Sequence, residues 1–424
     1  MSTLSHLGAR MARTSGLRSI MEDVAATRAA GPGERWLNLG VGNPALIPEA
    51  VAMWRGLAEE ALAEDFVSAG CLYGPSRGTT ALVDAVVEHF DSTYGWDIGP
   101  ENVVVGPGSQ MLCFIAAALF SGPGERGRTR VVLPALPDYA GYLGMSLEQD
   151  GLGGVGSRIV LEGERRFVYE LDHEELARRE DLGLLLLSSP CNPTGRSADE
   201  RDLRALAGIA SARGAVMLVD NAYGAPFPQV VEAAAEPLWH PDVINCFSAS
   251  KAGLPGERVG FAVGPRRHID AMVSFIANST LHAPQLIQLV LARALSGGRL
   301  AELAASVIRP YYLSRRQAAE KLLAELLPAD VDWRLHTAQG GMFCWLWINE
   351  PWFDDLELYH ALKERRVVVV PGRHFFPAAA ACDEHATRCV RISVTGEEAV
   401  IRDGIAELAE ALLRLRRRRG ADRS

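Results

Sequence analysis

Uninterrupted apolar runs recur between residues 100 and 265, and helix-like segments separate them. The runs predict strands at 103–105, 131–134, 184–188, 216–220, 243–247 and 259–263. Strands that read as continuous apolar runs are buried on both faces. Helices are predicted at 49–64 and at 198–213. Two further helices are predicted to end at Phe90 and at about Phe120. Strands that alternate with helices predict the α/β class, a mostly parallel sheet with helices on both faces.

The pattern changes towards the carboxyl terminus. A long helical region spans about 267–327, and an alternating strand occupies 336–347. A helix at 355–366, strands at 367–370 and 390–394 and a closing helix to about Arg417 follow. This order predicts a smaller α+β domain. We therefore expect an N-terminal segment, 1–48, that packs with the small domain, a large domain over 49–320 and a small domain over 321–424.

Polar residues gather just after the predicted strands. Ser109, Tyr139, Asn192, Asp220 and Lys251 each follow the carboxyl end of a different strand. Open α/β sheets bind ligands in the crevice outside those ends. Surface loops that were independent of one another would not share one edge, so this clustering predicts a binding site there.

One stretch, 248–258, carries chemistry suited to a cofactor with an aldehyde and a phosphate. Its amine, Lys251, can form a Schiff base with a carbonyl compound. Ser248, Ser250 and Arg258 can bind a phosphate, the arginine as a planar fork. A solvated surface turn is the alternative. The chain has only three Lys among its 43 basic residues, and the other two, Lys321 and Lys363, lie in helix-like segments.

Composition excludes several classes of protein. A net charge of −9 over 424 residues does not suggest a nucleic-acid-binding surface. The Arg-rich end, 414–419, is the exception, and we interpret it as the solvated end of a helix rather than a nucleic-acid or partner patch. The seven Cys have no metal-binding spacing and indicate a reducing compartment. No signal-type segment or long apolar stretch is present, so we expect a cytoplasmic protein without a membrane span.

Three motifs together resemble one family. Ser-x-Ser-Lys at 248–251, Asn-Pro-x-Gly at 192–195 and Asp-x-x-Tyr at 220–223 are similar to the fold-type I, pyridoxal-phosphate-dependent aminotransferases of classes I and II. The resemblance covers nearly the whole chain. Stretches 42–44, 221–224, 253–256 and 371–377 resemble the valine–pyruvate subgroup most. The resemblance implies pyridoxal 5'-phosphate as the cofactor and a mostly parallel large-domain sheet beside a smaller α+β domain.

The resemblance also implies cofactor-binding residues. Lys251 matches the Schiff-base lysine and proton shuttle, and Asp220 matches the partner of the pyridine nitrogen. Asn192 and Tyr223 match donors to the phenolic oxygen. Tyr139 matches the ring that stacks on the pyridine, with Tyr142 as the competing candidate. The phosphate partners would be Gly108, Ser109, Gln110, Ser248, Ser250 and Arg258, although Arg258 follows Lys251 by seven positions where many members have eight.

Substrate and partner residues follow from the same resemblance. Arg391 matches the receptor of the substrate α-carboxylate, and Asn43 and Asn192 would support it. His374 and Phe375 line the mouth of the site or simply pack there. Tyr73 matches a residue that reaches the phosphate in the neighbouring subunit, which implies a homodimer with shared sites. Ser279 or Thr280 could also reach across.

The implied reaction moves an amino group between an L-amino acid and a 2-keto acid in two stages, with ping-pong kinetics. A valine/alanine–pyruvate type is the first hypothesis. The second is an aminotransferase, lyase or decarboxylase for a nonproteinogenic amino acid in a specialised pathway. Arg18 bears on this choice, because it either borders the substrate side chain or points to solvent. The third hypothesis is a non-catalytic regulator; such proteins usually carry an added DNA-binding domain, and we expect neither the extra length nor a basic winged helix in this chain.

Overall fold

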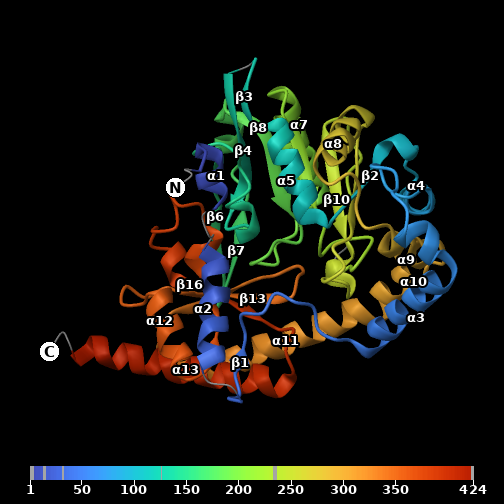
Figure 1. The fold of residues 1–424 in the computed structure, drawn as a ribbon. Helices are drawn as coiled ribbons and strands as arrows, with labels where there is room; N and C mark the ends of the chain where they lie inside the picture. Colours follow the sequence, from blue (N-terminus) through green and yellow to red (C-terminus); the bar gives the residue numbers. More distant parts are fainter. Residues whose placement is uncertain (1–3, 13–15, 31–32, 126, 233–235, 422–424) are drawn as a thin grey trace.

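An eight-stranded, mostly parallel sheet is the centre of the computed structural model, which describes residues 4–12, 16–30, 33–125, 127–232 and 236–421 (Figure 1). The strand order is β2-β11-β10-β9-β8-β4-β3, with β5 paired to β4. Only β11 and β3 run antiparallel to their neighbours. The strands are β2 (Val103–Gly106), β3 (Gly122–Gly124), β4 (Gly127–Leu136), β5 (Leu152–Gly156), β8 (Leu182–Ser188), β9 (Val216–Asp220), β10 (Val243–Ser248) and β11 (Gly260–Val263).

Helices cover both faces of this sheet because alternate residues of each strand point to opposite sides. Leu184, Leu218 and Ile244 pack against α5 (Ser109–Phe120) and α8 (Arg266–Ser279). Leu185 and Val219 pack against α7 (Glu200–Ala212) on the opposite face. Further along that opposite face lie α3 (Pro48–Asp65), α4 (Thr80–Tyr94) and α9 (Gln285–Ser296). The strands are apolar at every position because helices cover both faces of the sheet, as expected from the sequence.

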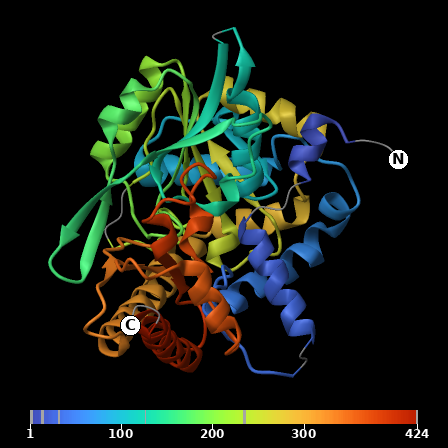
Figure 2. The same cartoon turned by 90° about the vertical axis from the view of Figure 1, so that its left-hand side faces the viewer.

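A second, six-stranded sheet has the order β15-β16-β13-β12-β7-β6. It packs against α11 (Arg309–Leu326), α12 (Asp355–Lys363) and α13 (Glu398–Ala421). A hairpin from the middle of the chain joins this sheet, since β7 pairs in parallel with β12 (Figure 2). The strands are β6 (Arg158–Glu162), β7 (Arg166–Glu170), β12 (Trp333–His336), β13 (Phe343–Ile348), β15 (Val370–Pro371) and β16 (Cys389–Ser393).

The start of the chain joins its C-terminal part. Strand β1 (Leu37–Asn38) pairs in parallel with β14 (Val367–Val368). Helices α1 (His6–Met11) and α2 (Gly16–Ala30) precede it, and α2 lies beside the C-terminal part (Figure 1). The division at residues 48 and 320 stays a prediction, and it did not anticipate that the hairpin at 158–170 enters the second sheet.

Most predicted elements are confirmed within a few residues. The apolar runs are the strands of the main sheet, and the α/β class is correct. The helical region 267–327 consists of α8, α9, α10 (Arg299–Leu303) and α11, with a π-helical turn at Ala304–Ile308. The strand predicted at 336–347 begins only at Phe343, and the short helix α6 (His173–Arg178) and the strands β5, β6, β7 and β12 were not predicted. No helix in the described ranges is long and apolar enough to cross a membrane.

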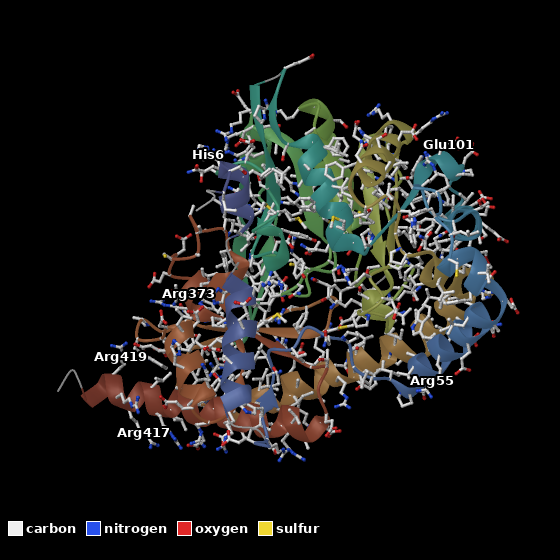
Figure 3. All side chains as sticks on the ribbon, viewed as in Figure 1. His6, Arg55, Glu101, Arg373, Arg417 and Arg419 are labelled. Carbon is white, nitrogen blue, oxygen red and sulfur yellow. The ribbon has the colours of Figure 1, made fainter. Side chains whose placement is uncertain are left out.

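The Arg-rich end of α13 lies on the surface. Arg417 and Arg419 are exposed at the end of this helix (Figure 3). Arg419 forms an ion pair with Glu357 of α12, and Arg416 forms one with Asp330. The Arg-rich end is therefore an exposed helix end, as expected, and two of these arginines also hold α13 against its neighbours.

Candidate active site

A cavity of about 490 Å³ opens at the carboxyl ends of the central strands, where polar residues gather in the sequence. The second sheet contributes Arg391 from β16, and the N-terminal segment contributes residues 38 and 40–43. Of the residues predicted to form the site, the following line this cavity: Asn43, Ser109, Gln110, Tyr139, Asn192, Asp220, Tyr223, Ser248, Ser250, Lys251, Arg258 and Arg391. Gly108 is adjacent to Ser109, whereas Tyr73 is not among the lining residues.

Lys251 lies in a short 3-10 helix, Ala249–Ala252, directly after β10. Gly253 ends that helix at φ +118°, a conformation that favours glycine. Trp54 Nε1 donates a hydrogen bond to the Ala252 carbonyl at 2.8 Å, which holds the turn. Lys251 Nζ donates to the carbonyl oxygen of Gly42 at 2.6 Å. Burial, and then the nearby Arg391 and Arg258, lower the pKa of Lys251 to about 8, so its amine is partly neutral near pH 7.

Asp220 ends β9 and is buried. Its carboxylate accepts hydrogen bonds from Tyr142 Oη at 2.9 Å and from the Ala222 N–H at 3.1 Å. Burial raises its pKa although these donors act against the shift. A buried carboxylate with no cation beside it is costly. A protonated ring nitrogen in the cavity would supply that cation, so the site fits the pyridine ring that the resemblance implies.

The first turn of α5 and the loop after Lys251 form a cradle for an anion. Gly108 has φ +85°, and a Cβ at this position would lie 2.5 Å from Arg258 Nη2. Arg258 Nη1 donates to Ser250 Oγ at 3.1 Å, and Ser248 Oγ donates to the same atom at 3.0 Å. The free N–H groups of a helix start favour anions. These groups fit a phosphate. The side chain of Gln110 donates to the Gly141 carbonyl, so its backbone is the part directed to the cradle.

Arg391 is 2% exposed, and it forms no salt bridge with a described residue. Its Nη1 donates to Asn192 Oδ1 at 2.9 Å, and its Nη2 donates to the Gly40 carbonyl at 2.8 Å. Its Nε is buried without a partner. The ring centroids of Phe343 and Phe375 lie 4.2 and 5.2 Å from the guanidinium carbon of Arg391. Burial lowers its pKa to about 10. An orphaned donor on an unpaired buried cation fits an incoming carboxylate.

The two competing tyrosines have different surroundings. Both Tyr139 and Tyr142 line the cavity. Tyr142 is fully buried, its ring stands at 90° to that of Tyr139, and its hydroxyl is bonded to Asp220. Tyr142 therefore supports Asp220, and the assignment of Tyr139 as the stacking ring stays a prediction. This hydrogen bond could not be predicted from local pattern, because it joins positions 78 residues apart.

Six other predicted positions are not among the residues that line the cavity. Phe375 is fully buried against Arg391 and Trp345, and His374 does not line the cavity, so the alternative of packing fits both. Arg18 is exposed and pairs with Glu22 at 3.0 Å, so it points to solvent. Tyr73 is 88% exposed, and its ring lies 6.0 Å from that of His282. Ser279 and Thr280 are exposed at the end of α8.

Sequence reasoning missed the apolar wall of the cavity. Helix α2 contributes Ile20, Met21, Val24 and Ala25, and the segment of β14 and β15 contributes Val368 and Val370. The signal was present at 20, 21, 24 and 25, since residues spaced by four lie on one helix face. Nothing in the sequence showed what that face would contact.

The chain is similar to one known family and to several curated proteins. The family described as "Aminotransferase class I and II" matches residues 34–408. Valine–pyruvate aminotransferase of Escherichia coli (strain K12) is 33% identical over 97% of this chain and 98% of its own. A 2-aminoadipate transaminase of Thermus thermophilus is 28% identical over 72% of this chain and 73% of its own.

Solved structures give the same result. A putative amino-acid aminotransferase of Psychrobacter arcticum 273-4 is 29% identical and superposes with a TM-score of 0.91, covering 98% of this chain and 99% of its own. Valine-pyruvate aminotransferase of Salmonella typhimurium LT2 is 31% identical with a TM-score of 0.84, covering 95% of this chain and 100% of its own. The chain therefore belongs to the class I and II aminotransferases, enzymes of fold type I that use pyridoxal phosphate.

Proposed function

We propose that this aminotransferase moves the amino group between a small aliphatic L-amino acid, valine or alanine, and pyruvate or another 2-keto acid. The observation that carries the proposal is the pairing of two surfaces in one cavity. Arg391 offers a buried cation to a carboxylate, while α2, Val368 and Val370 present a wall without a charged side chain. A charged substrate side chain would be desolvated against that wall at considerable cost. The relatives named for valine and pyruvate support the same choice.

The residues of the chain have separable tasks in this reaction. Pyridoxal phosphate, when bound, supplies an aldehyde that takes up the amino group and a ring that withdraws electrons. Lys251 Nζ, with a pKa of about 8, can take up the proton of the substrate α-carbon, hold it and release it again. Asp220 holds the ring nitrogen protonated. Asn192 Oδ1 accepts from Arg391, which leaves its Nδ2 free to donate to the phenolic oxygen.

The remaining cofactor contacts belong to the same proposal. Tyr223 donates to the phenolic oxygen beside Asn192, and Tyr139 stacks on the ring. Arg391 orients the substrate carboxylate, with Asn43 beside it on the cavity wall. Gly108, Ser109, Gln110, Ser248, Ser250 and Arg258 bind the phosphate.

We infer a homodimer that shares its sites. Leu72 and Tyr73 are 62% and 88% exposed, and Phe66, Val67 and Leu281 are exposed as well. Gln285 Nε2 donates to the Leu72 carbonyl at 2.6 Å and so holds this loop in place. A fixed, exposed apolar surface favours a protein partner. A second copy would bring Tyr73, and Ser279 or Thr280, to the phosphate of its neighbour. Seven free thiols favour a reducing compartment, the cytoplasm.

The donor preference tests the proposed reaction. Purified holoenzyme is mixed with single amino acids, and the shift in cofactor absorbance is followed together with the keto acid released. We expect kcat/KM for valine or alanine to exceed that for aspartate by at least about 100-fold, since desolvating an unpaired charge costs several kcal/mol. Release of carbon dioxide or of elimination products would instead identify a lyase or decarboxylase. A preference for acidic or nonproteinogenic donors would contradict the aliphatic assignment.

The role of Arg391 is testable without turnover. The probe is 3-methylbutanoate, a carboxylate with no amino group to transfer, and the measurement is the rise in thermal stability of the holoenzyme. At about 100 times Kd, the wild type should gain about 2.7 kcal/mol. Arg391→Met should raise Kd about 10- to 100-fold, because a hydrogen bond to a charged group contributes about 1.5–3 kcal/mol.

The matched control is Arg316→Met. Arg316 is equally buried but pairs with Glu232 and Glu320 outside the cavity. This variant should lose stability because Glu232 loses its ion pair with Arg316, whereas Glu320 keeps Arg166, and it should keep the wild-type Kd for 3-methylbutanoate. An unchanged Kd in Arg391→Met would remove Arg391 from the proposed site.

Mixed dimers test the shared site. Tyr73→Phe should weaken cofactor binding about 10-fold or more, through the loss of a hydrogen bond to phosphate. Lys251→Arg removes the attachment point. In dimers with one chain of each kind, one site combines a normal lysine with a normal partner tyrosine, so half of the sites should bind as in the wild type. If no site recovers, Tyr73 acts within its own subunit.

A further inference from the structure

Helix α2 is fastened to the C-terminal part of the chain by one carboxylate, that of Asp23. Lys363 Nζ donates to both of its oxygens, at 2.7 Å to Oδ1 and 2.6 Å to Oδ2. Tyr359 Oη donates to Oδ2 at 2.6 Å. Both donors lie on α12, one helical turn apart, so they reach the same acceptor from one face. We call Asp23, Tyr359 and Lys363 the Asp23 clamp.

The clamp lies beside an apolar contact between the same two helices. Ile20 and Val24 of α2 form a small buried cluster with Tyr359 of α12 and Val368 of β14. Tyr359 therefore packs with its ring and donates with its hydroxyl. Figures 1 and 2 show α2 running alongside the C-terminal part, away from the main sheet. Besides α12 and β14, α2 also contacts the turn Ala140–Tyr142 that follows β4.

The same helix forms part of the cavity wall. Ile20 and Val24 line both the buried cluster and the cavity, and Met21 and Ala25 extend the cavity side of the helix. The outer face instead carries Arg18 and Glu22, an exposed i,i+4 pair that fixes nothing in the core. Since a shift of α2 would move all four apolar residues together, the position of α2 sets the width of the pocket.

Lysine use in the chain also singles out this contact. Among 43 basic residues only three are Lys, and one of them is Lys363. A compact ammonium can sit between both oxygens of one carboxylate, whereas the longer planar guanidinium prefers a side-by-side approach. The side chain of Lys363 is 21% exposed and that of Asp23 is 43% exposed, so the pair lies at the partly exposed edge of the contact between α2 and α12.

We propose that Asp23, held by Tyr359 and Lys363, is a positioning residue for substrate selection, because it fixes α2 as the wall that the side chain of the amino donor packs against. This inference rests on the proposed aliphatic specificity. A branched side chain, as in valine, reaches the wall and gains from its fixed position. The methyl group of alanine gains less. Release of the clamp therefore weakens the binding of larger donors first and leaves the chemical step unchanged.

The test compares Lys363→Met with Lys321→Met in the holoenzyme. Lys321 is 77% exposed and makes only a long i,i+4 pair with Glu325, so its variant is the matched control. In Lys363→Met we expect KM for valine to rise about tenfold with kcat within about twofold, the pattern of lost uniform binding. KM for alanine should rise less, and the cofactor absorbance should not change. Lys321→Met should match the wild type throughout.

A second measurement makes the cause visible. Hydrogen exchange of the peptide that covers residues 16–30 should be faster in Lys363→Met and in Asp23→Asn, whereas peptides around Lys251 should not change. Lys363→Arg keeps the charge, so its KM for valine should lie between those of Lys363→Met and the wild type.

Three results would overturn the inference. They are unchanged exchange of 16–30 in Lys363→Met, faster exchange with an unchanged KM for valine, and equal losses of kcat for both donors. A wild-type enzyme that rejects valine would refute the proposed function instead. In that case the clamp is tested with two other donors, the bulkiest and the smallest that the wild type accepts. The KM for the bulkier donor should again rise more in Lys363→Met.

Discussion

A half-buried lysine and a buried arginine share one cavity without a salt bridge to a carboxylate of the described residues, and this unpaired charge is the constraint on which the site depends. Lys251 and Arg391 bond mainly to neutral groups, including the carbonyls of Gly42 and Gly40. Burial disfavours both charges, which lowers the pKa of Lys251 to about 8 and that of Arg391 to about 10. Anionic ligands, a phosphate and a carboxylate, relieve this cost when they bind.

Unpaired charges in the site destabilise the folded chain, and the buried apolar strands of the main sheet offset that cost. The fully apolar strands β8, β9 and β10 bury both faces, and their carboxyl ends deliver Asp220 and Lys251 to one edge. The second sheet brings Arg391, and the N-terminal segment closes the cavity from a third direction. Parts of the chain that are hundreds of residues apart therefore have to meet before the site is complete. The pairing of β1 with β14 and the Asp23 clamp are two contacts that bring the N-terminal segment there.

The sequence predicted what local pattern and loop position control. The strands of the main sheet and the helices between them follow from apolar periodicity, and the residues after those strands converge because parallel strands share an edge. Lys251, Asp220 and Asn192 were found in this way. The resemblance added Arg391, which lies in the interior of β16 and has no local signal of function.

What the sequence could not predict depends on tertiary pairing. The hairpin β6–β7 joins a sheet whose other strands lie more than 150 residues later, so its partner could not be inferred from its own pattern. Tyr139 and Tyr142 are equivalent in the sequence and differ only in what surrounds them. Arg18 lies on the right helix but on its outer face, and the apolar face two residues later forms the wall.

The most direct test of the account is the identity of the lysine that carries the cofactor. Holoenzyme is reduced with borohydride, digested and mapped by mass spectrometry, with Lys251→Arg as the control. The account predicts a pyridoxyl label on Lys251 alone, and a rate of cofactor attachment to the apoenzyme that rises with pH and levels off above about pH 8, because the neutral amine is the reacting form. A label on Lys321 or Lys363 in the wild type, or any label that persists in Lys251→Arg at the wild-type level, would contradict it.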